Sequence, residues 1–149
     1  MMDNVCVVKA ESGQEIEAVL RSCRNDFFNQ SLNNDETIAE LCRKFAKFAC
    51  VLVVCEGKSI AGFVAFYVNG ETKTAYISMI VIQKTYQGRG FGSVLLEQMI
   101  AECKRAGQQR IRLEVANQNE KAIGFYKKWG FAWEGQASET SDYYSLALE

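Results

Sequence analysis

In the middle of the chain, the pattern of hydrophobic residues changes from one typical of strands to one typical of a helix at a cluster of three glycines. The stretch CVLVVCEGKSIAGFVAFYVNGETKTAYISMIVI, which begins at residue 50, is dense in Val, Ile, Phe and Tyr and is interrupted by the turn sequences EGK and NGET. It predicts three antiparallel strands, at about 50–56, 60–68 and 73–82. A leucine-rich segment then predicts a helix at about 90–106 that ends at Gly107. A loop that contains the glycines therefore leads from a strand into a helix.

A glycine-rich turn between a strand and a helix is typical of a phosphate-binding site. The first turn of a helix has N–H groups without partners and carries a partial positive charge. Gly88, Gly90 and Gly92 have no side chains that keep a pyrophosphate away from these amides. The same three glycines are also compatible with a tight turn that binds nothing.

Two common nucleotide-binding motifs do not fit this turn. A P-loop requires a Gly-Lys-Ser/Thr sequence, which does not follow here. The dinucleotide motif G-x-G-x-x-G requires its last glycine where the chain has Ser93 or Leu95. A phosphate ligand of another kind is therefore indicated.

The other segments complete an α/β fold (α+β, with a mixed sheet and helices on both faces). A strand at 5–9 precedes a helix that begins at the capping-box residues Ser12 and Glu15, and a second helix begins near Asn33. The sequences QRIRLEVA, FAWEGQ and DYYSLALE predict strands, and a helix at about 119–129 separates the first of them from the other two. The predicted order is βααβββαβαββ, in a single domain over residues 1–149.

The composition argues against several classes of function. The chain has 17 Lys and Arg against 18 Asp and Glu and no basic run, so we expect no nucleic-acid partner. It has no histidine, which excludes Ser-His-Asp and Cys-His hydrolases. The six cysteines form no C-x-x-C pair, so we expect no metal site and mostly buried cysteines in a reducing compartment. No apolar run approaches the roughly 20 residues that span a bilayer, and no secretory signal is recognisable, so we expect a cytoplasmic protein without a membrane partner.

Two motifs resemble the signatures of the GCN5-related N-acetyltransferase (GNAT) family. The segment QGRGFG is similar to the family's Q/R-x-x-G-x-G/A signature, with Gln87, Gly90 and Gly92 at the defined positions. The segment LEVANQNEKAIGFYKKWGF resembles the second signature, an Asn-x-x-Ala run that leads into Tyr-x-x-x-Gly-Phe. Together the motifs cover residues 76–132. Many members have proline and arginine before the glycines, where this chain has Lys84 and Gln87.

The resemblance implies acetyl-CoA as the cofactor and coenzyme A as the product. It places the coenzyme pyrophosphate on the backbone amides of residues 87–93, namely Gln87, Gly88, Arg89, Gly90, Phe91, Gly92 and Ser93. It places the pantetheine arm against the backbone of the strand before the turn, at Ile80, Val81 and Ile82, where an exposed strand edge has unpaired N–H and C=O groups.

Three residues of the helix at about 119–129 share one face, because Asn119, Ala122 and Tyr126 lie at positions i, i+3 and i+7. The resemblance implies that this face contacts the coenzyme, with Asn119 bonded to the pantetheine or to a nearby water. Asn119 is equally suited to capping the helix, and the two roles are compatible.

Tyr126 is the candidate general acid. Acetyl transfer to an amine expels a thiolate whose conjugate acid has a pKa of about 8.5, and a phenol with a pKa of about 10 can return a proton to it. The alternative is that Tyr126 is an aromatic residue that packs the helix against the sheet.

Glu114 is the candidate general base. Its place in LEV, twelve residues before Tyr126, resembles the branch of the family that acetylates N-terminal amines of ribosomal proteins, where this glutamate acts as a base. The alternatives are a strand glutamate paired with Arg110 or Arg112, and a water chain oriented by Ser78 or Asp142.

The amine acceptor is open, and we expect a small molecule or a peptide with a primary amine. Acidic residues suited to attracting it are Asp26, Asp35, Glu139 and Asp142, and aromatic residues suited to lining its site are Phe27, Phe28, Tyr143 and Tyr144. The same residues are compatible with a solvated loop and a core strand. A chain that binds acyl-CoA as a sensor or partner module without turnover is the alternative function, and a homodimer is expected by analogy with relatives.

Overall fold

The computed structural model describes residues 4–149 and divides into two compact units. The first consists of Met1–Tyr67 and Ser78–Ala101, and the second of Val68–Ile77 and Glu102–Glu149. Over the described residues, the order of helices and strands is the predicted βααβββαβαββ, with three short 3-10 turns added. The predicted fold class is therefore confirmed.

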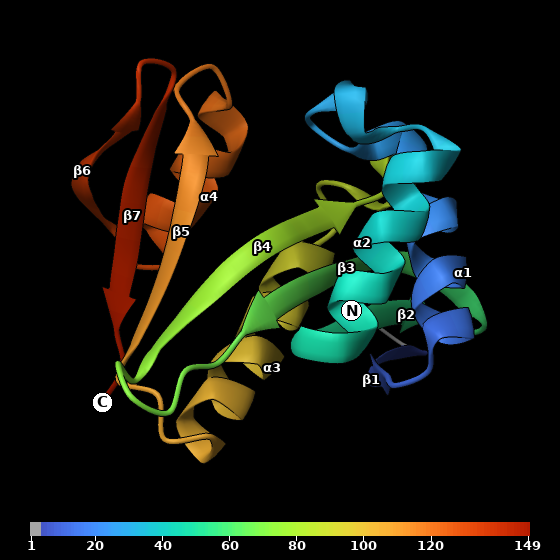
Figure 1. The fold of residues 1–149 in the computed structure, drawn as a ribbon, viewed down its shortest axis with the longest axis horizontal. Helices are drawn as coiled ribbons and strands as arrows, with labels where there is room; N and C mark the ends of the chain where they lie inside the picture. The colour runs from blue at the N-terminus through green and yellow to red at the C-terminus, as the bar shows by residue number, and fades with distance from the viewer. Residues whose placement is uncertain (1–3) are drawn as a thin grey trace. The chain divides into compact units, whose positions relative to one another are not determined.

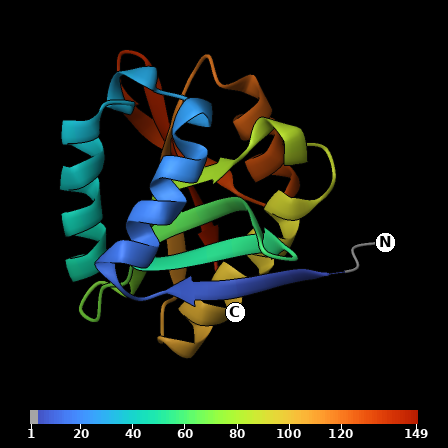
Figure 2. The same cartoon turned by 90° about the vertical axis from the view of Figure 1, so that its right-hand side faces the viewer.

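The first unit is a sheet with the strand order β1-β2-β3-β4, of which β4 contributes its second half (Figure 1). The pairs β1–β2 and β2–β3 are antiparallel. The helices α1 and α2 lie side by side over these strands, as Figure 2 also shows. The elements that lie wholly or partly in this unit are β1 Val5–Ala10, α1 Gly13–Cys23, η1 Arg24–Asp26, η2 Gln30–Leu32, α2 Asp35–Phe48, β2 Cys50–Glu56, β3 Ser59–Tyr67, β4 Thr74–Ile82, η3 Lys84–Tyr86 and α3 Phe91–Arg105, of which the second unit contains the last four residues.

Local sequence signals set the helix starts in this unit. The Ser12 side chain accepts a hydrogen bond from the Glu15 amide, and the Glu15 carboxylate accepts one from the Ser12 amide, so the predicted capping box is present. The helix α2 is capped by Asn34, whose side chain accepts from the Thr37 amide. The predicted start near Asn33 is therefore one residue early.

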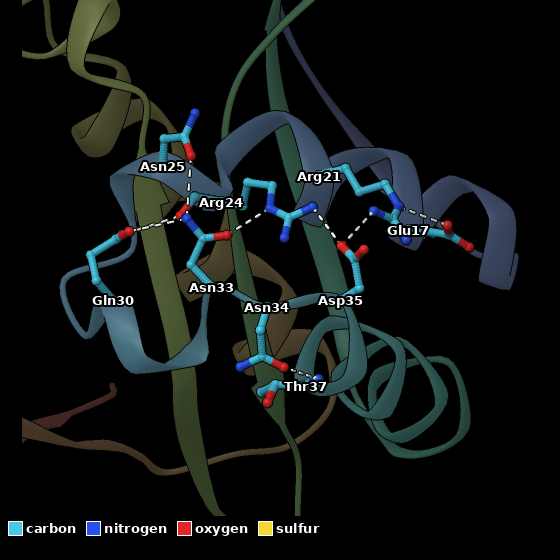
Figure 3. Close-up of polar contacts among 9 residues, drawn as sticks. All are labelled: Glu17, Arg21, Arg24, Asn25, Gln30, Asn33, Asn34, Asp35 and Thr37. Carbon is cyan, nitrogen blue, oxygen red and sulfur yellow. Dashed lines mark hydrogen bonds and ion pairs between the residues drawn. The ribbon is translucent and has the colours of Figure 1, made fainter.

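Asn33 belongs instead to a polar network that orders the connection between α1 and α2 (Figure 3). Its side-chain oxygen accepts from Arg24 Nε at 2.6 Å, and its amide nitrogen donates to Asn25 and Gln30. Asp35 accepts from Arg24 at 2.9 Å and from Arg21 at 3.4 Å. These contacts hold the pKa of the Asp35 carboxyl below its usual value, so this carboxylate is already neutralised by arginines of its own chain.

Both faces of the central strands of this unit are buried. One face packs Val51, Val53 and Phe63 against the stripes of α1 and α2. Because side chains alternate along a strand, Leu52, Val54 and Phe66 point to the opposite face, and they are buried as well. The apolar residues that repeat at helical spacing along α1 and α2 are part of the core: Ile16, Val19, Leu20, Cys23, Ile38, Cys42 and Phe45 are buried, and Leu41 is half-buried.

The second unit is a sheet with the strand order β4-β5-β7-β6. The first half of β4, Thr74–Ile77, pairs in parallel with Arg110–Leu113 of β5, whereas β5–β7 and β6–β7 are antiparallel. The sheet of each unit therefore contains β4 residues, and the parallel pair makes the second one mixed. Its other elements are β5 Arg110–Ala116, α4 Glu120–Lys128, β6 Ala132–Ser138 and β7 Ser141–Ala147.

A buried glutamine joins two loops of the second unit. The Gln108 side chain accepts from the backbone N–H of Asn69 at 3.0 Å and donates to its carbonyl at 3.1 Å. Gln108 is almost fully buried, so these two bonds satisfy an amide that would be costly to leave unpaired. Nothing in the local sequence predicts this contact, since 39 residues separate the partners.

The cysteines differ from the expectation of burial. Cys23, Cys42 and Cys103 are buried, but Cys50 and Cys55 are only half-buried and Cys6 is exposed. Cys6 is on β1, at the edge of the first unit's sheet, which explains its exposure. Among the described residues, no helix is long and apolar enough to cross a membrane.

We predict that Gly62→Ala destabilises the first unit, because a Cβ at this position in β3 would collide with the backbone carbonyl of Val81 and lie 2.6 Å from Ile82 Cδ1. The loss in the free energy of unfolding should be about 1–3 kcal/mol, as for other overpacked sites. Urea unfolding measures it. Gly13→Ala is the matched control, since its Cβ would meet nothing within 4 Å; an equal loss in both variants would contradict the close approach of β3 and β4.

Candidate functional site

The glycine turn of the first unit has a left-handed backbone at two of its glycines. Gly88 and Gly90 have φ of 78° and 87°, in the left-handed region that side chains disfavour. The first helical bond of α3 runs from the Val94 amide to the Gly90 carbonyl. The amides of Phe91, Gly92 and Ser93 form the first turn, where N–H groups have no acceptor within the helix. The turn thus presents backbone donors suited to an anion.

Two glutamines fasten this turn to the sheet. The Gln87 side chain donates to the Ile82 carbonyl at 2.9 Å, and the Gln87 backbone N–H donates to the Lys84 carbonyl. The Gln83 side chain donates to the Ile60 carbonyl at 2.6 Å. The glutamine of the first signature therefore fixes where the turn leaves β4, which is a structural contribution of its side chain.

Arg89 supplies a positive charge within the turn. Its guanidinium lies 2.6 Å from the Glu56 carboxylate and stacks near the rings of Tyr86 and Phe91, at 5.7 and 5.0 Å from their centroids. Phe91 is buried, and the Tyr86 ring meets it edge-on at 5.3 Å. Arg89 is still 49% exposed, so it is anchored at the surface of the turn and remains accessible to a phosphate.

The strand before the turn presents one free side within its unit. In the order β1-β2-β3-β4, the residues Ile80, Val81 and Ile82 belong to the terminal strand, which has β3 on one side only. The Val81 side chain is buried in the core beneath α1 and α2, whereas Ile80 and Ile82 are half-buried. The backbone of these three residues therefore offers an edge to which an extended ligand can be added, although the Ile82 carbonyl already accepts from Gln87.

In the second unit, the N-terminus of α4 is capped by Asn119. Its side-chain oxygen accepts from the Ala122 amide at 3.3 Å. Of the two roles considered for Asn119, helix capping is therefore confirmed. Asn119 and Ala122 are both half-buried, so contact with a ligand remains compatible with the cap.

Tyr126 is buried, with 4% of its surface exposed. Its ring packs against Phe125 and Phe131, with centroid distances of 5.6 and 5.3 Å. This burial raises the pKa of the Tyr126 phenol above its usual value, because the phenolate is poorly solvated there. Tyr126 thus has the aromatic packing role and also keeps its proton at any physiological pH.

Glu114 is exposed on β5 and is held by a serine. Its carboxylate accepts from the Ser141 hydroxyl at 2.6 Å, and Ser141 lies 2.7 Å from the Ser138 hydroxyl. Because the Ser141 proton is directed to Glu114, Ser138 is the donor in the second bond. Ser141 is itself buried, so it orients one oxygen of the carboxylate from within the unit.

The alternative pairing of Glu114 with arginine is wrong. Arg110 and Arg112 instead bind Glu134 on β6, at 2.9 and 2.6 Å. The guanidinium of Arg112 also lies over the Tyr143 ring, 3.8 Å from its centroid. Glu114 is therefore not neutralised by these two arginines.

The sequence did not indicate two residues that lie near Glu114. Ser141 faces Ala116 across the β5–β7 ladder, so it shares a face of the sheet with Glu114. Tyr76 on β4 is also close: burial and then the charge of Glu114 raise the pKa of its phenol. Both contacts depend on strand register, which no local motif encodes.

The residues proposed to contact the acceptor have mixed roles. Phe27 and Tyr144 are buried core residues, whereas Phe28 is 61% exposed. The Asp26 carboxylate accepts from the Lys84 amide at 3.1 Å and so ties the connection after α1 to the turn after β4. Of these aromatic residues, Phe28 has the greatest free surface.

Comparison with known proteins agrees with this geometry. Residues 14–131 match the acetyltransferase (GNAT) family. N-alpha-acetyltransferase 30 of Schizosaccharomyces pombe is 39% identical over 63 residues, which are 42% of this chain and 42% of that relative. The chain thus spans less than half the length of that relative.

Solved structures of acetyltransferases have the same fold. The ribosomal-protein-S18-alanine N-acetyltransferase from Escherichia coli superposes with a TM-score of 0.76 at 19% identity, over 97% of this chain and 92% of that one. The PaiA N-acetyltransferase from Thermoplasma acidophilum, in complex with coenzyme A, superposes with a TM-score of 0.74 at 16% identity, over 96% and 99%. The family match covers well over half of the sequence, and the chain belongs to the GNAT acetyltransferase family.

Proposed function

We propose that the chain is an acetyl-CoA-dependent N-acetyltransferase that transfers the acetyl group to a primary amine by direct attack in a ternary complex. The observation that carries the proposal is the turn before α3, where left-handed glycines lead into the free amides of a helix N-terminus. A structural relative that was solved with coenzyme A supports the choice of ligand.

The residues of the first unit fit the coenzyme. A Cβ at Gly88 would meet nothing within 4 Å, so the surface of the turn there is open. We assign the pyrophosphate to the amides of residues 87–93, with Arg89 beside it, and the pantetheine arm to the backbone edge of Ile80–Ile82. When bound, the coenzyme supplies an acetyl thioester. The protein groups bind it mainly through main-chain donors, which accounts for the glycines.

Tyr126 is proposed to protonate the sulfur that leaves. A phenol with a raised pKa stays protonated, so it is available as a donor when a thiolate develops. The tight packing between Phe125 and Phe131 fixes the direction of the ring. Asn119 and Ala122 are proposed to line the same helix face toward the coenzyme.

Glu114 is proposed to take the proton from the amine, which must lose it before attack. The Ser141 bond holds one carboxylate oxygen and leaves the other for the amine or for an intervening water. Two of the relatives named above are, by their printed names, an N-alpha-acetyltransferase and a ribosomal-protein-S18-alanine N-acetyltransferase, which favours a peptide α-amine over a side-chain amine as acceptor.

Coenzyme affinity tests the turn. Gly90→Ala should weaken coenzyme A binding by about tenfold, since a left-handed alanine costs about 1–2 kcal/mol and its methyl group obstructs the amides. Gly107→Ala is the matched control, because it has the same kind of φ and an added Cβ would meet nothing within 4 Å, but it lies in the second unit and outside the turn. Calorimetry should show native affinity for Gly107→Ala; equal losses would mean that backbone strain alone explains both.

Turnover tests the acid. Tyr126→Phe keeps the ring and its packing and should lower kcat by about 10²- to 10⁴-fold with little change in coenzyme affinity. Tyr144→Phe, another buried tyrosine of the second unit, should retain the native rate. Release of free thiol from acetyl-CoA across a panel of amines measures both. A native chain that binds the coenzyme but acetylates no amine above background would instead favour the module without turnover.

Replacing Glu114 and, separately, the control residue Glu134 tests the proposed base. Glu114→Gln should lower kcat/KM by about 10²-fold or more at neutral pH, and a more alkaline buffer should restore part of it, because the free amine then forms without a base. Ser141→Ala should give a smaller loss, since the carboxylate is only misoriented. Glu134→Gln loses two ion pairs yet should retain the rate. If Glu134→Gln and Glu114→Gln lose activity alike, the role assigned to Glu114 is wrong.

A further inference from the structure

Two cysteines of the first unit face each other across neighbouring strands. Cys6 on β1 is the register partner of Cys55 on β2. Cys6 is exposed and Cys55 is half-buried, so a solute can reach the pair from the Cys6 side. Of the other cysteines, Cys50 faces Phe66 on β3, and the remaining three are buried on helices.

The backbone distance between the two cysteines suits a disulfide. The Gly57 amide donates to the Asn4 carbonyl at 2.8 Å, which marks these two residues as a hydrogen-bonded pair of the ladder. Such pairs alternate along antiparallel strands, so Cys6 and Cys55 form the next one, with Cα atoms about 5.5 Å apart. Disulfides span Cα distances of about 4.4–6.8 Å.

The side chains are also directed toward each other. Burial raises the pKa of the Cys55 thiol, and the charge of the neighbouring Cys6 and its side-chain interaction with Cys55 raise it further. Cys55 therefore stays protonated beside the more accessible sulfur of Cys6. This arrangement makes Cys6 the residue that reacts first and Cys55 the residue that resolves the product.

We propose that Cys6 and Cys55 are a reversible thiol–disulfide site that reacts with low-molecular-weight disulfides. The Cys6 thiolate attacks a disulfide RSSR, which forms the Cys6–SR mixed disulfide and releases one thiolate. Cys55 loses its proton to solvent and attacks the Cys6 sulfur, which releases the second thiolate. In sum, two protein thiols and RSSR give one protein disulfide and two RSH.

The geometry favours a bond that is easily reduced again. Facing Cβ atoms on paired strands are about 4.5–5.5 Å apart, with hydrogen-bonded pairs at the longer end, whereas a disulfide requires about 3.8 Å. The strands must therefore approach each other locally, and the register shift beside Cys55 in the β2–β3 ladder is where β2 can adjust. A strained, exposed disulfide is a labile one.

The cysteine pair is connected to the glycine turn through an ion pair of the neighbouring residue. Glu56 follows Cys55 directly and holds Arg89 of the turn at 2.6 Å. A disulfide at Cys55 displaces the Glu56 backbone and loosens this anchor, so oxidation should weaken coenzyme binding. This consequence rests on the proposed function, whereas the disulfide itself does not.

Peptide mapping tests the disulfide. The native chain is incubated with glutathione disulfide, alkylated and digested without reductant; we expect a bridged Cys6–Cys55 peptide that dithiothreitol removes. Cys55→Ser should stop at the glutathione adduct of Cys6, and Cys42→Ser should behave as the native chain. A stable glutathione adduct on Cys6 of the native chain, a bridge to another cysteine, or no reaction would overturn the proposal.

Affinity for desulfo-coenzyme A, which has no thiol to reduce the bond, tests the consequence. The oxidised chain should bind it about 2- to 5-fold more weakly than the reduced chain, as expected for the loss of one half-exposed ion pair. Oxidant treatment of Cys6→Ser should change nothing. Equal affinities of the two native forms would refute the link to the turn, whereas no binding by either form would refute the proposed coenzyme site and leave the disulfide result standing.

Discussion

The left-handed backbone at Gly88 and Gly90 is the constraint on which the rest of the account depends. It lets the connection that leaves β4 at Ile82 and passes through η3 turn into α3 at Phe91, so that the first-turn amides of α3 follow directly on the glycine turn. The side chain of Gln87 and the ion pair of Arg89 with Glu56 then hold this turn in place. A preorganised set of main-chain donors avoids the entropy loss of ordering flexible side chains, which suits the diphosphate that we propose for this turn.

The second unit shows how packing and chemistry can depend on the same burial. The rings of Phe125 and Phe131 enclose Tyr126, which stabilises the unit and also raises the pKa of the phenol. The packing role and the proposed acid role are therefore not alternatives. Glu114 has the opposite environment: it is exposed and is oriented by the buried Ser141. The proposed acid is therefore enclosed by rings, whereas the proposed base is open to an amine or a water.

Features encoded within a few residues were predictable from the sequence. The capping box of Ser12 and Glu15, the positive φ of the glycine turn and the cap at Asn119 all follow from local rules, and the structure has each of them. The element order follows from hydrophobic periodicity for the same reason. Whether the whole sequence is one domain, and which roles the site residues have in catalysis, remain predictions.

Features that depend on register or on distant partners were not predictable. Asn34 rather than Asn33 caps α2 because Arg24 and Gln30 engage Asn33, and Asp35 is occupied by two arginines of α1 and the turn after it. The bond from Ser141 to Glu114 and the facing of Cys6 and Cys55 arise only when strands pair in one particular register. Cys6 is exposed because its strand is at a sheet edge, which composition alone does not reveal.

Amide chemical shifts test the central claim most directly. In a titration of the labelled chain with coenzyme A, the account predicts the largest shifts at the amides of residues 88–93, while pantetheine, which lacks the pyrophosphate, should shift the amides of Ile80–Ile82 and leave the turn nearly unchanged. If coenzyme A binds and its largest shifts lie outside this turn, or if pantetheine perturbs the turn equally, the main-chain diphosphate site at the start of α3 is contradicted.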